Sequence, residues 1–160
     1  MCVTELIMTD RLVLSPLEVA DAAKMVNVLS DRDLYAFTGG EPPTLDQLRD
    51  RYERQTLGAP RNGESWHNWI LRLEGKAIGY VQATVEGGSA DLGWVVGSSW
   101  QGSGYATEAS KAMRNWLAEH GVTAFSAHIL PGHAASGAVA AKLGLLPTGQ
   151  LDEEGEMVWA

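Results

Sequence analysis

The residues best suited to chemistry form a short glycine turn between an apolar run and a helical pattern. Residues 92–96 are apolar, Gly102 and Gly104 follow, and helical periodicity extends over residues 107–119. The first turn of a helix presents backbone N–H groups without partners and the positive end of the peptide dipole. Glycine lets such a backbone curl closely around a bulky anion. The spacing therefore predicts a site for a phosphate or a pyrophosphate.

Two common phosphate-loop patterns do not fit this turn. The P-loop pattern requires a lysine after its glycines, and the dinucleotide pattern requires a small residue where Thr107 stands. The pattern that fits is Gln or Arg, any two residues, Gly, any residue, and Gly or Ala. Its residues here are Gln101, Gly102, Ser103, Gly104, Tyr105 and Ala106. A glycine pair between a strand and a helix can also be a tight turn without a ligand.

This segment resembles the pyrophosphate loop of the GNAT superfamily of acyl-CoA N-acyltransferases. With its flanks, Gly93-Trp94-Val95-Val96 and Gly104-Tyr105-Ala106-Thr107-Glu108-Ala109, it is similar to the branch that contains the ribosomal-protein N-terminal acetyltransferases. The resemblance implies that acetyl-CoA is the cofactor and that the loop, with Thr107, holds its pyrophosphate. It also implies direct transfer of the acetyl group to an amine, without an acyl-enzyme.

A second resemblance lies further along the chain. The family has Asn-x-x-Ser before a helix that ends in Lys-Leu-Gly, and this chain has His133, Ser136 and residues 142–144 at those positions. The resemblance implies that His133 replaces the asparagine that contacts pantetheine, and that Ser136 lies near the thioester. Ser136 can equally be a helix residue that bonds to local backbone.

Apolar periodicity predicts one α/β domain over residues 1–160. The predicted strands are residues 11–17, 66–73, 77–85, 90–96, 124–130 and 156–159, and the predicted helices are residues 21–29, 45–57, 107–119 and 134–143. This order matches the GNAT acyl-CoA N-acyltransferase fold. The resemblance implies an α+β arrangement: a central mixed, mostly antiparallel sheet with a V-shaped splay, flanked by about four helices.

The splay is expected between residues 92–96 and residues 124–130. The resemblance implies that Trp94, Val95 and Val96 present backbone groups to pantetheine, with the Val96 N–H as donor to the developing oxyanion. Asp91 stands where the family often has a catalytic glutamate, which implies a role as general base acting through water. His67 and His128 are alternative bases, because imidazole titrates in the useful pH range.

Fewer residues point to the proton donor for the thiolate and to the acceptor site. Many relatives protonate the departing thiolate with a tyrosine, but no tyrosine follows Tyr105. Ser136, His133 or water would replace it, or the thiolate leaves unassisted. The acceptor site is expected at the first two helices and their connecting loop. Its candidate residues are Phe37, Glu41, Trp66 and Trp69, with Glu41 able to attract an ammonium group.

Composition limits the partners. The net charge of −8 disfavours nucleic acid, which requires a basic face, and suits an amine-bearing acceptor. No apolar run approaches the roughly 20 residues of a membrane helix, and no signal peptide is evident. A single cysteine favours the reducing cytoplasm. Homodimers are common in the branch, so a homodimer is one expectation.

Three classes of function remain open. The first is an acetyl-CoA-dependent N-acetyltransferase that acts on a peptide or protein N-terminus or on a small-molecule amine. The second is a non-catalytic acyl-CoA-binding or sensor protein of the same fold, suggested by the missing tyrosine and by His133. The third is a nucleotide-binding domain that uses the same helix N-terminus for phosphate.

Overall fold

The computed structural model describes residues 3–37 and 39–160. Its strands are β1 (Ile7–Met8), β2 (Leu12–Pro16), β3 (Glu64–Leu73), β4 (Lys76–Glu86), β5 (Ser89–Val96), β6 (Ala124–Ile129), β7 (Pro147–Leu151) and β8 (Met157–Trp159). Its α-helices are α1 (Ala22–Val28), α2 (Leu45–Leu57), α3 (Tyr105–Glu119) and α4 (Ala134–Lys142). None of the described helices is long and apolar enough to cross a membrane.

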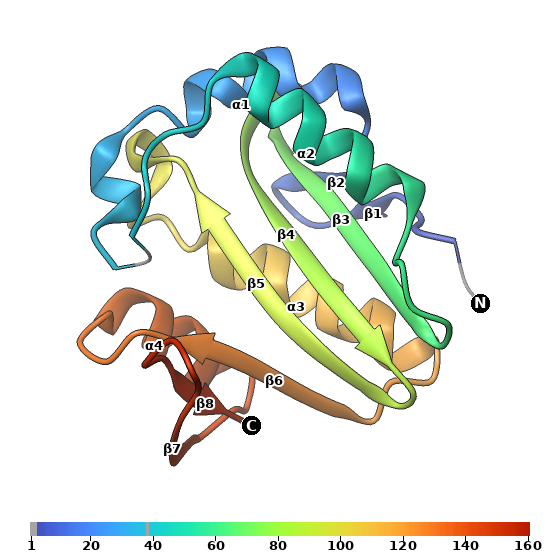
Figure 1. Ribbon diagram of the computed structural model, residues 1–160, viewed down its shortest axis with the longest axis vertical. Coiled ribbons are helices and arrows are strands. Elements are labelled where there is room, and N and C mark those ends of the chain that lie inside the picture. Colours follow the sequence, from blue (N-terminus) through green and yellow to red (C-terminus); the bar gives the residue numbers. More distant parts are fainter. Residues whose placement is uncertain (1–2, 38) are drawn as a thin grey trace.

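All the strands belong to one mixed sheet, in the order β1-β2-β3-β4-β5-β6-β8-β7 (Figure 1). The strands β2 to β5 are joined into antiparallel pairs, and among the described strands β5 and β6 alone run parallel. A parallel pair needs a crossover connection, which α3 provides. The predicted mixed, mostly antiparallel sheet with four flanking helices is therefore confirmed.

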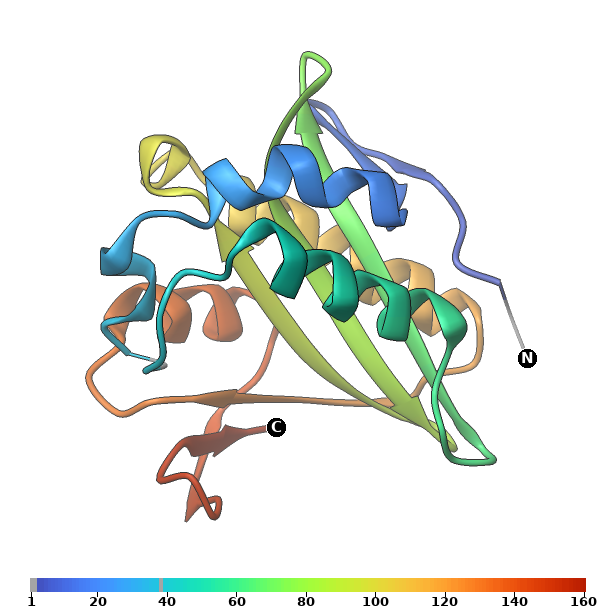
Figure 2. The ribbon, with the colours of Figure 1, turned by 45° about the horizontal axis from the view of Figure 1, so that its top comes forward.

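The parallel pair separates partway along its length. β5 and β6 pair from Ser89 and Ala124 up to Leu92 and Ala127. Beyond Leu92, β5 continues to Val96 along β4, whereas β6 turns toward β8. The two strands thus form a V whose open end lies beside the start of α3 (Figures 1 and 2). The splay is present at the position that the sequence predicts.

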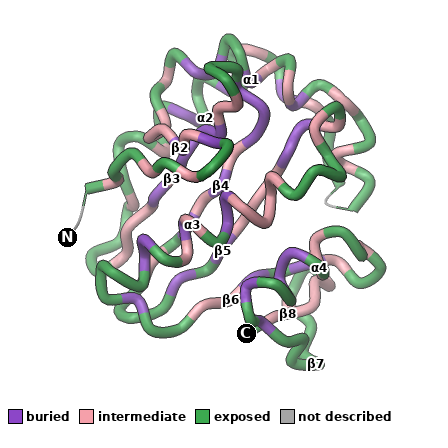
Figure 3. Tube along the Cα trace, turned by 180° about the vertical axis from the view of Figure 1, so that it is seen from behind, coloured by how far each residue is buried: buried purple, intermediate pink, exposed green. Residues whose placement is uncertain are grey.

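The helices cover opposite faces of the sheet. α1 and α2 lie on one face, and α3 lies on the other (Figure 2). Alternation along β5 follows this division: Leu92 and Val96 pack in a cluster with Met113 of α3, whereas Val95 packs with the cluster that contains Met25 of α1. Buried residues concentrate along the central strands between these two layers (Figure 3).

Local signals set most of the element boundaries. Thr44 caps α2, since its hydroxyl accepts from the Gln47 N–H and the Gln47 side chain accepts from the Thr44 N–H. α3 begins at Tyr105, two residues before the predicted start, because Gly104 serves directly as its N-cap. β1 and β7 were not predicted: β1 has only two residues, and β7 is exposed along its length.

Candidate active site

The glycine turn leaves the N-terminus of α3 open. Gly102 and Gly104 have φ of 84° and 83°, the left-handed region that other residues rarely adopt. Gly104 is the N-cap of α3, and no side chain of residues 3–37 or 39–160 provides a cap hydrogen bond there. The Gln101 side chain donates to the Val96 carbonyl at 3.0 Å, which ties the loop to the end of β5. The first-turn N–H groups are therefore available to an anion.

Arg11, which sequence reasoning missed, holds the other side of this loop. Its guanidinium donates to the Ser103 carbonyl at 2.8 Å and to the Glu108 carboxylate at 2.7 Å, and lies 4.4 Å from the centre of the Tyr105 ring. Burial raises the pKa of Glu108, but hydrogen bonds from Thr9 and Arg11 outweigh it and bring the pKa below its ordinary value. The hydrogen bond from Arg11 to Ser103 joins residues 92 positions apart in the sequence, so no local sequence pattern predicts it.

Backbone groups of β5 point into the open V. The Gly97 N–H bonds to the Ile78 carbonyl of β4 at 2.8 Å. Because directions alternate along an antiparallel strand, Trp94 and Val96 turn their N–H and C=O groups away from β4, toward the gap. Val95 turns its backbone toward β4 instead. Of the three predicted backbone contacts, the geometry therefore favours Trp94 and Val96.

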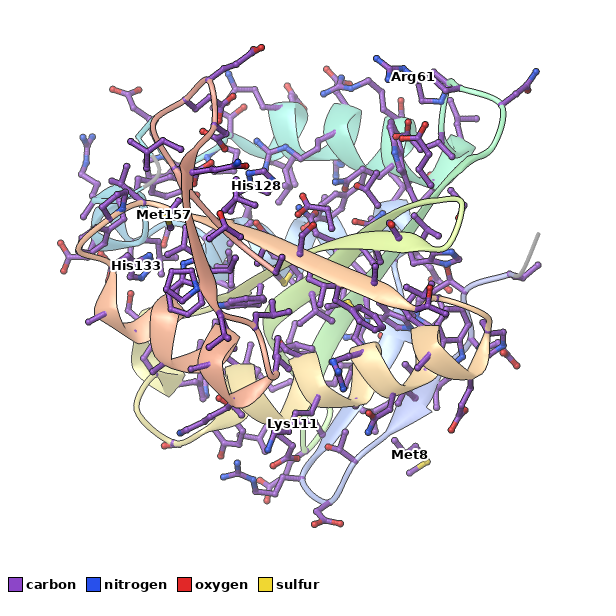
Figure 4. The ribbon with its side chains drawn as sticks, turned by 90° about the horizontal axis from the view of Figure 1, so that it is seen from below. Met8, Arg61, Lys111, His128, His133 and Met157 are labelled. Carbon is purple, nitrogen blue, oxygen red and sulfur yellow. The ribbon has the colours of Figure 1, made fainter. Side chains whose placement is uncertain are left out.

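The start of α4 brings together three predicted residues. The Ser136 hydroxyl lies 3.4 Å from Nε2 of His133, and the Phe37 ring stacks on the His133 ring with centroids 4.3 Å apart. Burial lowers the pKa of His133, which favours its neutral form. His133 lies at the beginning of α4, where Figure 4 labels it. The predicted acceptor residue Phe37 thus touches the predicted cofactor residue His133.

Asp91 and His128, which the sequence offered as alternative bases, are neighbours. His128 Nε2 lies 3.4 Å from the Asp91 carboxylate, and His128 Nδ1 lies 2.8 Å from the Asp152 carboxylate. The Ser126 hydroxyl donates to Asp91 at 3.0 Å. Burial raises the pKa of Asp91, although the charge of His128 and the hydrogen bond from Ser126 act against it. Asp91, His128 and Asp152 form a chain across β5, β6 and the β7–β8 turn. Figure 4 shows His128 close to Met157.

His67 lies elsewhere. Its side chain is buried on the α3 face of the sheet, 2.8 Å from the Thr4 hydroxyl and beside Trp116. Burial lowers the pKa of His67 and favours its neutral form. Because Asp91 faces the other side, the structure separates His67 from the other two base candidates.

The predicted acceptor residues are not gathered at one place. Trp69 is fully buried on the α3 face, where its indole N–H donates to the Glu5 carbonyl at 2.7 Å. Trp66 is half-buried and donates to the Glu64 carboxylate at 2.7 Å. Glu41 is exposed in the loop before α2. Trp69 therefore occupies a core position rather than an acceptor surface.

A sheet that opens into a V beside an uncapped glycine turn is the architecture of the acyl-CoA N-acyltransferases. The family model described as "Acetyltransferase (GNAT) domain" matches residues 11–146, so the chain belongs to the GNAT acetyltransferase family. No curated protein sequence matches the chain significantly.

Solved structures share this fold at low sequence identity. A GNAT-family acetyltransferase from Bacillus anthracis has a TM-score of 0.81 and 19% identity, covering 97% of this chain and 95% of its own. The ribosomal L7/L12 α-N-protein acetyltransferase RimL, in complex with coenzyme A, has a TM-score of 0.84 and 15% identity, covering 97% of this chain and 96% of its own. The aminoglycoside acetyltransferase AAC(6′)-Ib, also in complex with coenzyme A, has a TM-score of 0.76 and 21% identity, and the match covers 92% of each chain.

Proposed function

We propose that this chain transfers an acetyl group from acetyl-CoA directly to a primary amine, without an acyl-enzyme. The observation that carries the proposal is the gap that opens between β5 and β6 after Leu92 and leads to the uncapped start of α3. Pantetheine would lie in this gap against the backbone of Trp94 and Val96. The complexes of RimL and AAC(6′)-Ib with coenzyme A support the same cofactor for this chain.

The pyrophosphate would lie at the start of α3, where N–H groups and the helix dipole favour an anion. The residues proposed to hold it are Gln101, Gly102, Ser103, Gly104, Tyr105, Ala106 and Thr107. His133 and Ser136 would border the pantetheine from the other arm of the V. Val95 would contribute packing beneath the site.

Transfer requires a neutral amine. Its nitrogen attacks the thioester carbonyl carbon, the oxygen becomes anionic, and the C–S bond then breaks. The Val96 N–H would stabilise the oxyanion, and the Asp91–His128 pair would receive the amine proton. Asp91 and Val96 are five residues apart in β5, about 16 Å in an extended strand. The proton would therefore travel through water. The Ser136 hydroxyl or the neutral His133 ring would donate a hydrogen bond to the departing thiolate, which takes its proton from water.

The acceptor would be a peptide or protein N-terminus or a small-molecule amine. RimL acts on a ribosomal protein and AAC(6′)-Ib is an aminoglycoside acetyltransferase, which supports an amine acceptor in either class. Asp91, Asp152 and Glu156 gather acidic groups around His128, where β5 and β6 are still paired, which suits an arriving ammonium ion. The single cysteine fits action in the cytoplasm.

Titration calorimetry with acetyl-CoA tests the cofactor. We expect the unmodified protein to bind and Gly104→Glu to abolish binding, because a glutamate there adds bulk and like charge to the pyrophosphate site. Gly63→Glu is the control for backbone strain, because Gly63 has the same φ of 83°. A Cβ at Gly63 would meet open space, whereas one at Gly104 would lie 3.4 Å from the Arg11 guanidinium, and Gly63 precedes β3 at the opposite end of the sheet.

Both proteins must first be shown to fold by circular dichroism. Failure of the unmodified protein to bind acetyl-CoA would overturn the proposal. Equal loss of binding in both variants would show that strain, rather than the site, causes the effect.

The pH profile of kcat/KM tests the role of Asp91. The Ser126 hydrogen bond lowers the pKa of Asp91, so Ser126→Ala should raise that pKa further above its ordinary value. Because the base acts in its deprotonated form, we expect the acidic limb of the profile to move to higher pH. Ser89→Ala, at the exposed start of β5, should leave the limb in place. An unmoved limb in Ser126→Ala would exclude Asp91 as the titrating base.

A further inference from the structure

A second polar site lies beside the gap, under α2. A cavity of about 260 Å³ is lined by residues of α2, β3 and β4. We name it the α2 cavity, and its polar lining residues are Arg51, Tyr52, Gln55, Asn68, Tyr80 and Gln82. No residue of this set belongs to the pyrophosphate loop or to the Asp91–His128 pair.

The polar groups of the α2 cavity are not paired with one another. Tyr52 is only 4% exposed, and its buried hydroxyl has no hydrogen-bond partner among the described residues. The side chains of Asn68 and Gln82 make no hydrogen bond within that same part of the chain. Buried polar groups in folded proteins are usually satisfied, so the unpartnered Tyr52 hydroxyl indicates a site that a polar ligand completes.

The charged and polar residues that line the α2 cavity indicate which kind of ligand it would bind. Among the described residues that line it, the exposed Arg51 alone is charged, although the chain has 20 acidic and only 12 basic residues. Arg51 forms no ion pair with the described residues. Burial raises the pKa of Tyr52 and of Tyr80, so both hydroxyls stay protonated and able to donate. A guanidinium with two hydroxyl donors favours a carboxylate over an ammonium ion.

The sheet register places this cavity next to the proposed thioester site. Gln82 pairs with Gly93, and Tyr80 pairs with Val95, so the cavity floor adjoins the arm of β5 that lines the gap. Neighbouring strands are about 4.8 Å apart, and the cavity and the gap are separated by roughly two such spacings. A ligand that reaches both places would span about 10 Å.

We propose that the α2 cavity binds a carboxylate of the acetyl acceptor, so that this chain acts on amines that carry a carboxylate about 10 Å from the nitrogen. This inference rests on the proposed acetyl transfer. An extended peptide of three residues has the required length, with its amino group at the gap and its carboxylate at Arg51.

Triglycine and its C-terminal amide provide matched acceptors that differ in one charge. We expect kcat/KM for triglycine to exceed that for the amide by about 10-fold or more, expressed mainly in KM, because a hydrogen-bonded charge contributes to binding. Arg51→Gln should remove this preference, and Tyr52→Phe should reduce it. Arg54→Gln, on the same helix but outside the cavity lining, is the control. Equal kcat/KM for the two acceptors, or a preference that survives Arg51→Gln, would overturn the inference.

Binding to the protein alone separates this inference from the proposed function. Calorimetry with triglycine, without acetyl-CoA, should show binding that Arg51→Gln abolishes. If acetyl-CoA does not bind but Arg51-dependent triglycine binding remains, the acetyl transfer fails and the carboxylate site stands. If acetyl-CoA binds and amines are acetylated without regard to a carboxylate, the site fails alone.

Discussion

Asp91→Asn is expected to lower kcat of acetyl transfer by about 100-fold to 1,000-fold, in the range that a general base contributes. The amide keeps the shape of the side chain and its contact with Ser126, but it cannot accept the amine proton. The dissociation constant for acetyl-CoA should not change, because Asp91 lies beyond the proposed thioester site. Steady-state kinetics with an amine acceptor and calorimetry with acetyl-CoA measure the two quantities.

Asp46→Asn is the matched control for this change. Asp46 is a highly exposed aspartate in the first turn of α2, with 94% of its side chain accessible. A kcat in Asp91→Asn equal to that of the control would rule out Asp91 as the base. His128→Gln in the same assay then tests the neighbour, since its imidazole lies 3.4 Å from Asp91 and is held by Asp152.

Trp69→Ala is expected to destabilise the protein by about 3–5 kcal/mol, the usual cost of removing a large buried aromatic side chain. Trp69 is fully buried, its indole N–H donates to the Glu5 carbonyl, and its ring meets Trp116 edge-on at 5.3 Å. Urea denaturation followed by circular dichroism gives the free energy of unfolding.

Trp69→Phe distinguishes a core role from an acceptor role. It keeps an aromatic ring but loses the hydrogen bond to Glu5, so it should destabilise less than Trp69→Ala and leave KM for the acceptor unchanged. Trp66→Phe, in the same strand but half-buried on the other face, provides the comparison. A raised acceptor KM with unchanged stability in Trp69→Phe would contradict the core assignment.

Local chemistry made much of the fold predictable from sequence. The glycine turn at Gly102 and Gly104 depends on backbone conformations that only glycine adopts readily, and the Thr44–Gln47 capping box depends on residues three apart. Strand alternation and helical periodicity likewise act over a few residues. The order of elements, the splay and the uncapped start of α3 therefore follow from patterns within short segments and from the family resemblance.

The tertiary structure decided which distant residues meet. Arg11 reaches Ser103 and Glu108, and Asp152 reaches His128, only because the sheet places β2 and the β7–β8 turn beside them. The sequence by itself determined that a helix start suited to an anion follows β5. The side of the sheet that Trp69 faces was decided only by the folded sheet. Strand alternation shows which side chains share a face, but tertiary packing determines which helices cover that face, and here α3 covers the face of Trp69.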